Sequence, residues 1–275
     1  MNQNYIWNEK NGVPFITFPS FVRLGVLHGF STKLGGVSKG DCASMNMSFT
    51  RGDKEEDVRR NHRIFADAVG YHADHLVLSD QVHDTVVRRV DSSDCGKGVT
   101  LESDIIGVDG LITNDPNVVL MTFFADCVPL FFYDPKKRVV GASHSGWRGT
   151  VKRMGACTVE AMKREFSCDS KDIYAVIGPS ICQSCYEVSE EVIDGFRQEF
   201  SSKYWNCLWE SKENHKYQLN LWEANRIVLV EAGVLPQNIE VSGFCTCCHS
   251  DVLFSHRATN GHRGNLSGVI TLGER

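Results

Sequence analysis

Residues 123–134 read FFADCVPLFFYD, an apolar stretch that is interrupted by the acid Asp126 and the thiol Cys127. The apolar runs on either side, 118–124 and 128–133, have the length and composition of buried β-strands. A carboxylate in such surroundings must be paired or hydrogen-bonded, because burying it alone is costly in free energy. We therefore expect two core strands that carry a functional site into the interior at Asp126 and Cys127.

Other segments alternate between helix and strand character along the chain. Apolar spacing predicts helices at 54–70 and 150–166, and Ser189 and Asn220 are placed to cap two more that run to 200 and 232. Apolar or β-rich runs predict strands at 85–90, 138–144, 173–177, 239–244 and 268–272. Because this order is not a strict βαβ repeat, we predict an α+β fold with mixed β-sheets covered by helices, in a single domain over residues 1–275.

The composition is that of an ordinary globular protein, with 42% apolar and 23% charged residues in a chain of 275. A net charge of −5 does not indicate a nucleic-acid or membrane surface, so we expect neither as a partner. The start of the chain, MNQNYIWNEK, lacks the apolar core of a signal peptide. No apolar run reaches the ~18 residues that a membrane span needs. We expect a cytoplasmic protein.

The chain contains 11 cysteines, an odd number without a secretory signal, so we do not expect a disulfide framework. Most are interpreted as small buried residues. The segment CTCCH at 245–249 invites a zinc-finger interpretation, which we do not favour, because structural sites need CxxC pairs at two separate places. One other close pair has this spacing, which leaves open a site formed by Cys182, Cys185, Cys245 and Cys248. The sequence assigns no role to these four residues or to Cys247.

Three residues of the types that bind metals stand where a predicted element ends: His83 in DQVH, Cys127 in ADC and His144 in ASHSGWRG. Two imidazoles and one thiolate would leave a fourth position open on a tetrahedral Zn²⁺, as in catalytic zinc sites. The same residues also suit a cysteine nucleophile with His144 or His83 as its base. Asp126 would find its partner either in a metal-bound histidine, which it would orient, or in a helix N-terminus.

Two segments have the residues to bind an anion. GWRG at 146–149 opens a predicted helix, and Arg148 would add a bidentate donor for a phosphate or carboxylate. HGFSTKLGGVS at 28–38 is interpreted as a loop rich in glycine and hydroxyl groups, from which Ser31 and Lys33 would reach an anion. This second segment is not a P-loop, because GxxxxGK[ST] is absent.

Eight motifs occur in one order: HGFSTKLGGVS, DQVH, DGLIT, ADCVPLFFYD, ASHSGWRGT, IGPSICQSCYEV, LNLWEANR and SHRATNGHRG. Together they resemble the YfiH family, also called the laccase-domain or polyphenol oxidase family, from about residue 27 to 271. The resemblance implies a four-layer fold of helices and mixed sheets, in a class with cysteine-hydrolase-like toxins. It also implies a phosphorylase of adenosine, inosine and methylthioadenosine with adenosine deaminase activity, although the family's older label is multicopper oxidase.

Carried over by position, the resemblance implies that His83, Cys127 and His144 bind the metal. The sequence departs from the family at Lys33, where an arginine is usual, and around Arg257, where the family's YRRD-like run is replaced by SHRA. Zinc is expected rather than copper, since a multicopper centre needs further histidines and the 10 present form no HxH pair.

We therefore predict a zinc-dependent enzyme that transfers the ribosyl group of a purine nucleoside to inorganic phosphate. Arg148 and Lys33, with Ser31 and Arg257, would hold the phosphate, and Asp126 or a metal-bound water would protonate the leaving base. Two alternatives are a metal-independent cysteine hydrolase that uses Cys127 and a copper polyphenol oxidase. A third is a non-catalytic nucleoside-binding protein. The sequence makes no prediction about oligomeric state.

Overall fold

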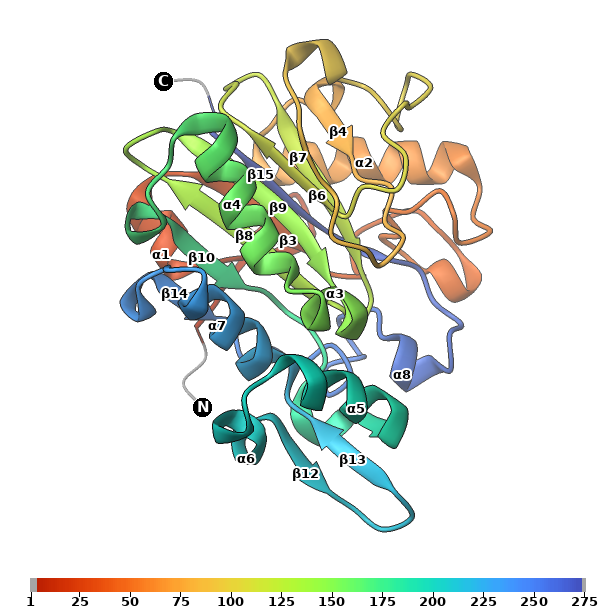
Figure 1. Cartoon of the computed structure of the whole chain (residues 1–275). Helices are drawn as coiled ribbons and strands as arrows, with labels where there is room; N and C mark the ends of the chain where they lie inside the picture. Colours follow the sequence, from red (N-terminus) through yellow and green to blue (C-terminus); the bar gives the residue numbers. More distant parts are fainter. Residues whose placement is uncertain (1–3, 274–275) are drawn as a thin grey trace.

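The chain crosses from one large β-sheet to a second at residues 125–127 of the computed structural model, which describes residues 4–273 (Figure 1). Strand β7 (Val119–Phe124) belongs to the first sheet and β8 (Val128–Asp134) to the second. Asp126 has a left-handed backbone conformation, with φ at 85°. This residue lets the chain turn between the sheets, so the interruption in FFADCVPLFFYD is the point where the chain changes sheet.

The first sheet has six strands and is antiparallel except for the pair formed by β4 and β7. Its order is β1 (Ile6–Lys10), β2 (Val13–Thr17), β3 (Leu27–Ser31), β15 (Leu266–Thr271), β7 and β4 (Leu76–Leu78). The second sheet also has six strands, and its two outermost pairs are parallel. Its order is β14 (Ile239–Val241), β10 (Tyr174–Ile177), β8, β9 (Val139–Ser145), β6 (Gly110–Thr113) and β5 (Val87–Arg89).

The two sheets face each other across an apolar core, and helices cover their outer faces (Figure 1). Phe30 and Phe124 of the first sheet share this core with Leu111 and Phe131 of the second. Helix α2 (Glu55–Val69) packs on the outside of the first sheet, while α4 (Met154–Phe166) and α7 (Leu221–Glu231) pack on the second. The resulting four layers of helices and mixed sheets confirm the predicted α+β class.

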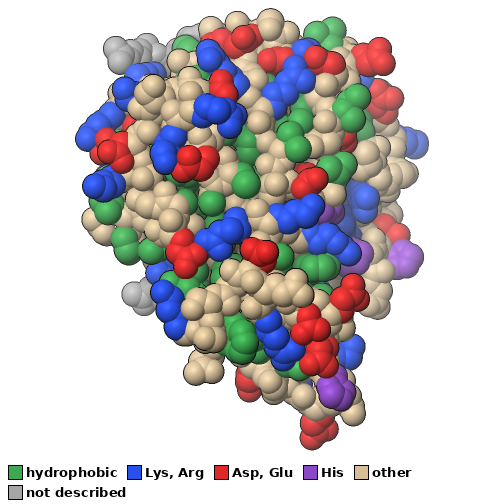
Figure 2. Space-filling model, viewed as in Figure 1, with side chains coloured by type: hydrophobic (Ala, Val, Ile, Leu, Met, Phe, Trp, Pro, Cys, Tyr) green, Lys and Arg blue, Asp and Glu red, His purple; other side chains and the backbone are tan. Residues whose placement is uncertain are grey.

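A smaller sheet extends from this body, with order β11 (Glu187–Ser189), β13 (Lys216–Leu219) and β12 (Trp209–Ser211). It packs with α5 (Glu190–Glu199) and α6 (Trp205–Leu208), and Figure 2 shows it as a lobe below the main body. The other short helices are α1 (Pro19–Leu24), α3 (Trp147–Val151) and α8 (His256–Thr259). None of the helices in the described part of the chain has the length and apolarity to cross a bilayer.

Most predicted elements are confirmed, including the Asn220 cap, whose side chain accepts the backbone N–H of Glu223 at 3.0 Å. The single helix predicted at 150–166 is wrong, because Arg153 adopts a left-handed conformation and separates α3 from α4. Residues 28–31 form part of β3 and are not the loop predicted at 28–38. The single domain over residues 1–275 stays a prediction, and its ends lie outside the described residues.

Gly268 of β15 packs directly against Phe131 of β8 in the second sheet, and a Cβ atom there would come within 2.2 Å of Phe131 Cζ. We expect Gly268→Ala to lower the free energy of unfolding by about 1–3 kcal/mol, because the packed ring must be displaced. Gly195→Ala, within α5, is the matched control and should raise stability by roughly 0.5–1 kcal/mol. Urea unfolding of both variants tests this, and an undiminished stability of Gly268→Ala would contradict the packing.

Candidate active site

Three elements bring His83, Cys127 and His144 to one point. Cys127 follows the crossover, His144 is the sixth residue of β9, and His83 lies in the loop between β4 and β5 with φ at 64°. The two imidazole rings meet edge to face, with centroids 4.7 Å apart, and Cys127 Sγ lies 3.9 Å from His83 Nε2. One ligand atom from each residue lies within 4.8 Å of the other two. The structure therefore joins the three residues that the sequence singled out.

Asp109, just before β6, contacts the imidazole of His144 and the backbone of His83. Its carboxylate is fully buried and accepts a hydrogen bond from His144 Nδ1 at 2.8 Å. It also accepts the backbone N–H groups of Val82, His83 and Asp84 at 2.9, 3.1 and 3.0 Å. Because His144 donates through Nδ1, its Nε2 is the ring nitrogen that would bind a metal.

The charges of Cys127, His144 and Asp109 depend on one another. Burial opposes ionisation of Cys127, but the positive charge of His144 and hydrogen bonds with both histidines outweigh it and lower the pKa of the thiol to about 6. Burial likewise opposes protonation of His144, yet the Cys127 thiolate and the Asp109 carboxylate raise its pKa to about 9. At neutral pH the metal-free site therefore holds a thiolate beside an imidazolium ion.

The donor set fits a metal ion. One thiolate and two imidazoles are ligands of zinc and of several transition metals, and three protein ligands leave a position open for substrate. Gly146, the residue before α3, leaves space beside the ligands because it has no side chain. A Cβ there would lie 3.1 Å from both Cys127 Sγ and His83 Cδ2. The imidazolium proton of His144 would be released when a metal binds.

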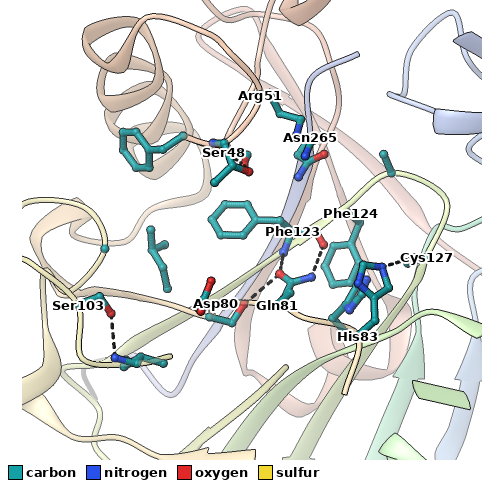
Figure 3. A pocket seen from close by; sticks show the side chains of 18 of the residues that line it. Ser48, Arg51, Asp80, Gln81, His83, Ser103, Phe123, Phe124, Cys127 and Asn265 are labelled. Atoms are coloured by element: carbon teal, nitrogen blue, oxygen red, sulfur yellow. Dashed lines mark hydrogen bonds between the residues drawn. The ribbon is translucent and has the colours of Figure 1, made fainter. Parts of the chain in front are cut away.

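Two cavities meet at this centre and share His83, Ala125, Cys127 and Arg263 as lining residues. The first has a volume of about 490 Å³ and is shown in Figure 3. Gln81 is fixed in its wall, since its amide Nε2 donates to the Phe123 carbonyl at 2.8 Å and its Oε1 accepts the Phe123 N–H at 2.7 Å. The same cavity is lined by aromatic, hydroxyl, amide, basic and acidic side chains, among them Ser48, Arg51, Ser79, Asp80, Phe124 and Asn265.

The second cavity, of about 370 Å³, is basic. Arg148 lines it with its guanidinium group 4.3 Å from the centroid of the Trp147 ring. No carboxylate within residues 4–273 forms an ion pair with Arg148. Arg257 also lines this cavity, but its guanidinium donates to the carbonyls of Cys185 and Glu187, both at 2.9 Å. The guanidinium of Arg148 is therefore more available to bind an anion than the guanidinium of Arg257.

Ser31 and Lys33 do not reach either cavity, contrary to the sequence-based expectation. Ser31 is fully buried in β3, where its hydroxyl accepts the backbone N–H of Ser267 at 2.9 Å. Lys33 instead donates from Nζ to the carbonyl of Ser250 at 2.5 Å. Both residues fix the C-terminal part of the chain against β3, because they belong to this strand and its continuation.

Asp126 also has partners other than a histidine. Its carboxylate accepts the Thr246 hydroxyl and the backbone N–H of Arg257, both at 2.6 Å. Since Arg257 lies in the first turn of α8, the structure supports the helix N-terminus rather than the histidine as the partner of Asp126. The carboxylate that orients His144 is Asp109, which the sequence reasoning missed. Asp109 begins the motif DGLIT, and the available signal was an acid directly before an apolar run.

The sequence reasoning also missed Arg51, Asp80, Arg263 and Asn265, which line the first cavity. These residues come from loops far apart in the chain, and none stands in a pattern that indicates a ligand. Arg263 occupies the junction of the two cavities, and its guanidinium donates to the Gly264 carbonyl at 3.3 Å and to the side chain of Asn265.

In metal-free protein, we expect alkylation of Cys127 by iodoacetamide to titrate with a midpoint near pH 6, because only the thiolate reacts and it is lost below its pKa. Peptide mass mapping after timed alkylation gives the rate for this residue alone. His144→Ala should move the midpoint upward. Cys207 is an internal reference, since burial and the charge of Glu223 raise its pKa. A Cys127 midpoint near 9 in the unmutated protein would contradict the ion pair.

Known proteins resemble this chain in both sequence and structure. The model of the family described as "Multi-copper polyphenol oxidoreductase laccase" matches residues 27–273. The chain is 40% identical to purine nucleoside phosphorylase YlmD of Bacillus subtilis over 250 residues, which cover 90% of this chain and 89% of that protein. It is 34% identical to a purine nucleoside phosphorylase of Bacteroides thetaiotaomicron, over 96% of this chain and 98% of that one. The crystal structure of YlmD from Geobacillus stearothermophilus is similar with a TM-score of 0.92 at 35% identity, covering 98% of this chain and 100% of that one.

Proposed function

The chain belongs to the multi-copper polyphenol oxidoreductase laccase family, and we propose that it acts as a zinc-dependent purine nucleoside phosphorylase. Relatives that match most of its length carry that name. The observation that carries the proposal is the junction of two unlike cavities at His83, Cys127 and His144. One cavity offers aromatic and amide groups for a nucleoside, and the other offers a free guanidinium for phosphate.

His83, Cys127 and His144 would hold the Zn²⁺, with Asp109 orienting the His144 imidazole and holding the backbone of His83. When bound, the ion supplies a Lewis acid beside the reacting atoms. Zinc suits this set better than a multicopper centre, which needs several clusters of histidines. Among residues 4–273, the only group of potential ligands that contains histidine is this one.

We place the purine in the first cavity and the phosphate in the second. Phe123 and Phe124 line the first cavity, and aromatic side chains bind the flat faces of nucleobases. Arg148 would bind two phosphate oxygens through its fork of N–H donors. Arg263, at the junction, is placed to contact both substrates. The ribose would then lie beside Cys127, where the cavities meet.

Phosphorolysis in this arrangement is a displacement at the ribose C1′ atom. A phosphate oxygen forms a bond to C1′ while the C1′–N9 bond breaks, and the electron pair leaves on the purine, which takes up a proton. The phosphate anion, held by Arg148, offsets the positive charge that grows on the ribose. Asp126 is poorly placed to supply the proton, because both its oxygens already accept hydrogen bonds. We assign proton transfer to Asp80, the only carboxylic acid among the residues lining the first cavity.

The proposal extends to adenosine, inosine and methylthioadenosine as nucleosides. It also includes hydrolytic deamination of adenosine, in which water replaces the amino group at C6 and ammonia leaves. That reaction requires the base, not the ribose, to approach the open side of the centre. A nucleoside that binds in two orientations in the first cavity would account for both reactions.

A metal-independent cysteine hydrolase is a second candidate, favoured by one observation. Asp109, His144 and Cys127 form a chain of acid, imidazole and thiol, with the pKa of the thiol lowered to about 6. The two candidates respond differently to reagents. Activity of the hydrolase would survive exhaustive chelation and be lost on alkylation of Cys127, whereas phosphorolysis should be lost on chelation and restored by Zn²⁺.

The test is to incubate the protein with inosine and inorganic phosphate and to separate hypoxanthine and ribose 1-phosphate by chromatography. We expect Cys127→Ala to abolish turnover, because a ligand of the centre is lost. Arg148→Met should raise KM for phosphate by about ten- to a hundred-fold, since a hydrogen bond to a charged group contributes about 1.5–3 kcal/mol.

Lys33→Met is the matched control, because Lys33 is also basic but lies outside both cavities. It should leave KM for phosphate unchanged. Full phosphorolysis by Cys127→Ala, or an equal effect of the Arg148 and Lys33 substitutions, would contradict the proposal.

A further inference from the structure

Four cysteines outside the active site converge at one point: Cys182, Cys185, Cys245 and Cys248. Their sulfur atoms all lie within 4.8 Å of one another. Cys248 Sγ lies 3.4 Å from Cys185 Sγ and 3.8 Å from Cys182 Sγ. The cluster combines two CxxC pairs that are more than sixty positions apart in the chain.

The parallel pairing of β10 and β14 explains why the two pairs meet. Parallel strands end at the same edge of a sheet, so the loops that follow Ile177 and Val241 leave it side by side. The pairing continues beyond the strands as a bridge between Ser180 and Cys245, with the Ser180 N–H donating to the Phe244 carbonyl at 3.2 Å. The first CxxC pair begins at Cys182, just after Ser180, and the second begins at Cys245 itself.

The sulfur geometry is that of metal ligands. A disulfide needs sulfur atoms about 2.05 Å apart, and all four thiols are free. Sulfurs at the corners of a tetrahedron around Zn²⁺, with Zn–S distances of about 2.3 Å, are separated by about 3.8 Å. The backbone N–H groups of Cys182 and Cys248 both donate to Cys245 Sγ at 3.3 Å. Such donors stabilise a thiolate, the form in which cysteine binds a metal.

We propose that Cys182, Cys185, Cys245 and Cys248 form a second metal site that binds one structural Zn²⁺ through four thiolates. Two CxxC pairs at separate places form a closed coordination shell, which leaves no position for a substrate. The site is therefore distinct in kind from the open centre at His83, Cys127 and His144. A structural zinc site at these cysteines, which we did not favour from the sequence, is thus the interpretation that the geometry supports.

The metal would hold together the loops that form one wall of the second cavity. Ile181 and Tyr186, which flank the first pair, line that cavity. The carbonyl of Cys185 accepts a hydrogen bond from the Arg257 guanidinium at 2.9 Å. Thr246, between the cysteines of the second pair, donates to Asp126 at 2.6 Å. A tetrathiolate site would thus fix the loops on which Asp126 and Arg257 depend, without touching substrate.

Metal analysis of the full-length protein, saturated with Zn²⁺ and then desalted, tests the proposal. We expect two equivalents of zinc per chain. Cys248→Ala should lose one equivalent, and His83→Ala together with Cys127→Ala should lose the other. Because the two losses are separate, a failure of the active-site assignment would not be mistaken for a failure of this one. Cobalt substitution of the His83 and Cys127 double variant should give the absorption of a tetrahedral thiolate site.

Two further variants keep the test independent of misfolding. Cys248→His preserves a zinc ligand and should retain the metal that Cys248→Ala loses. Cys247→Ser changes the neighbouring thiol, which lies outside the cluster, and should keep both equivalents. Retention of two equivalents by Cys248→Ala would overturn the site, as would a disulfide between these cysteines in freshly purified protein. Iron in place of zinc would overturn the choice of metal.

Discussion

The buried carboxylate of Asp109 is the constraint on which the active site depends. Four donors satisfy it: His144 Nδ1 and the backbone N–H groups of Val82, His83 and Asp84. A fully buried charge requires such partners, so the loop that carries His83 and the strand that carries His144 must meet at this point. Satisfying one anion therefore orients the His144 imidazole and fixes the backbone that carries His83 beside Cys127.

Asp126 plays a parallel role on the other side of Cys127. It lies at the crossover between the two main sheets, with a left-handed backbone, and binds Thr246 and the first turn of α8. Through these contacts the crossover is joined to the loops of the proposed tetrathiolate site and to Arg257. Asp109 thus orients His144 and holds the His83 loop, while Asp126 joins the segments that line the basic cavity. Cys127 lies between them, where the two cavities meet.

The sequence predicted the features that are encoded by neighbouring residues, such as strands, helix caps and the ends of elements. Apolar runs located the core strands, Asn220 capped its helix, and residues at element ends identified His83, Cys127 and His144. The three backbone donors to Asp109 could not be predicted, because they come from a loop that meets it only in the folded chain. The break at Arg153 was missed since the apolar spacing continues through it.

Ser31 and Lys33 show that a sequence pattern can also suggest a binding site where the fold provides none. Their composition suggested an anion-binding loop, but Ser31 lies in β3 and contacts β15, and Lys33 donates to the carbonyl of Ser250. Likewise, the two CxxC pairs meet because β10 and β14 pair in parallel, which the local sequence does not indicate. In each case the deciding fact was which strands become neighbours.

The central claim is that Asp109 holds the metal-binding geometry of the active site. Its most direct test is the release of zinc from Asp109→Asn under increasing chelator, with Asp126→Asn measured beside it. Loss of a carboxylate that orients a metal-bound histidine typically weakens metal binding about 10- to 100-fold. We predict that Asp109→Asn releases one zinc equivalent at correspondingly lower chelator concentration, whereas Asp126→Asn does not. Release of zinc from Asp109→Asn at the same chelator concentration as from the unmutated protein would contradict the account.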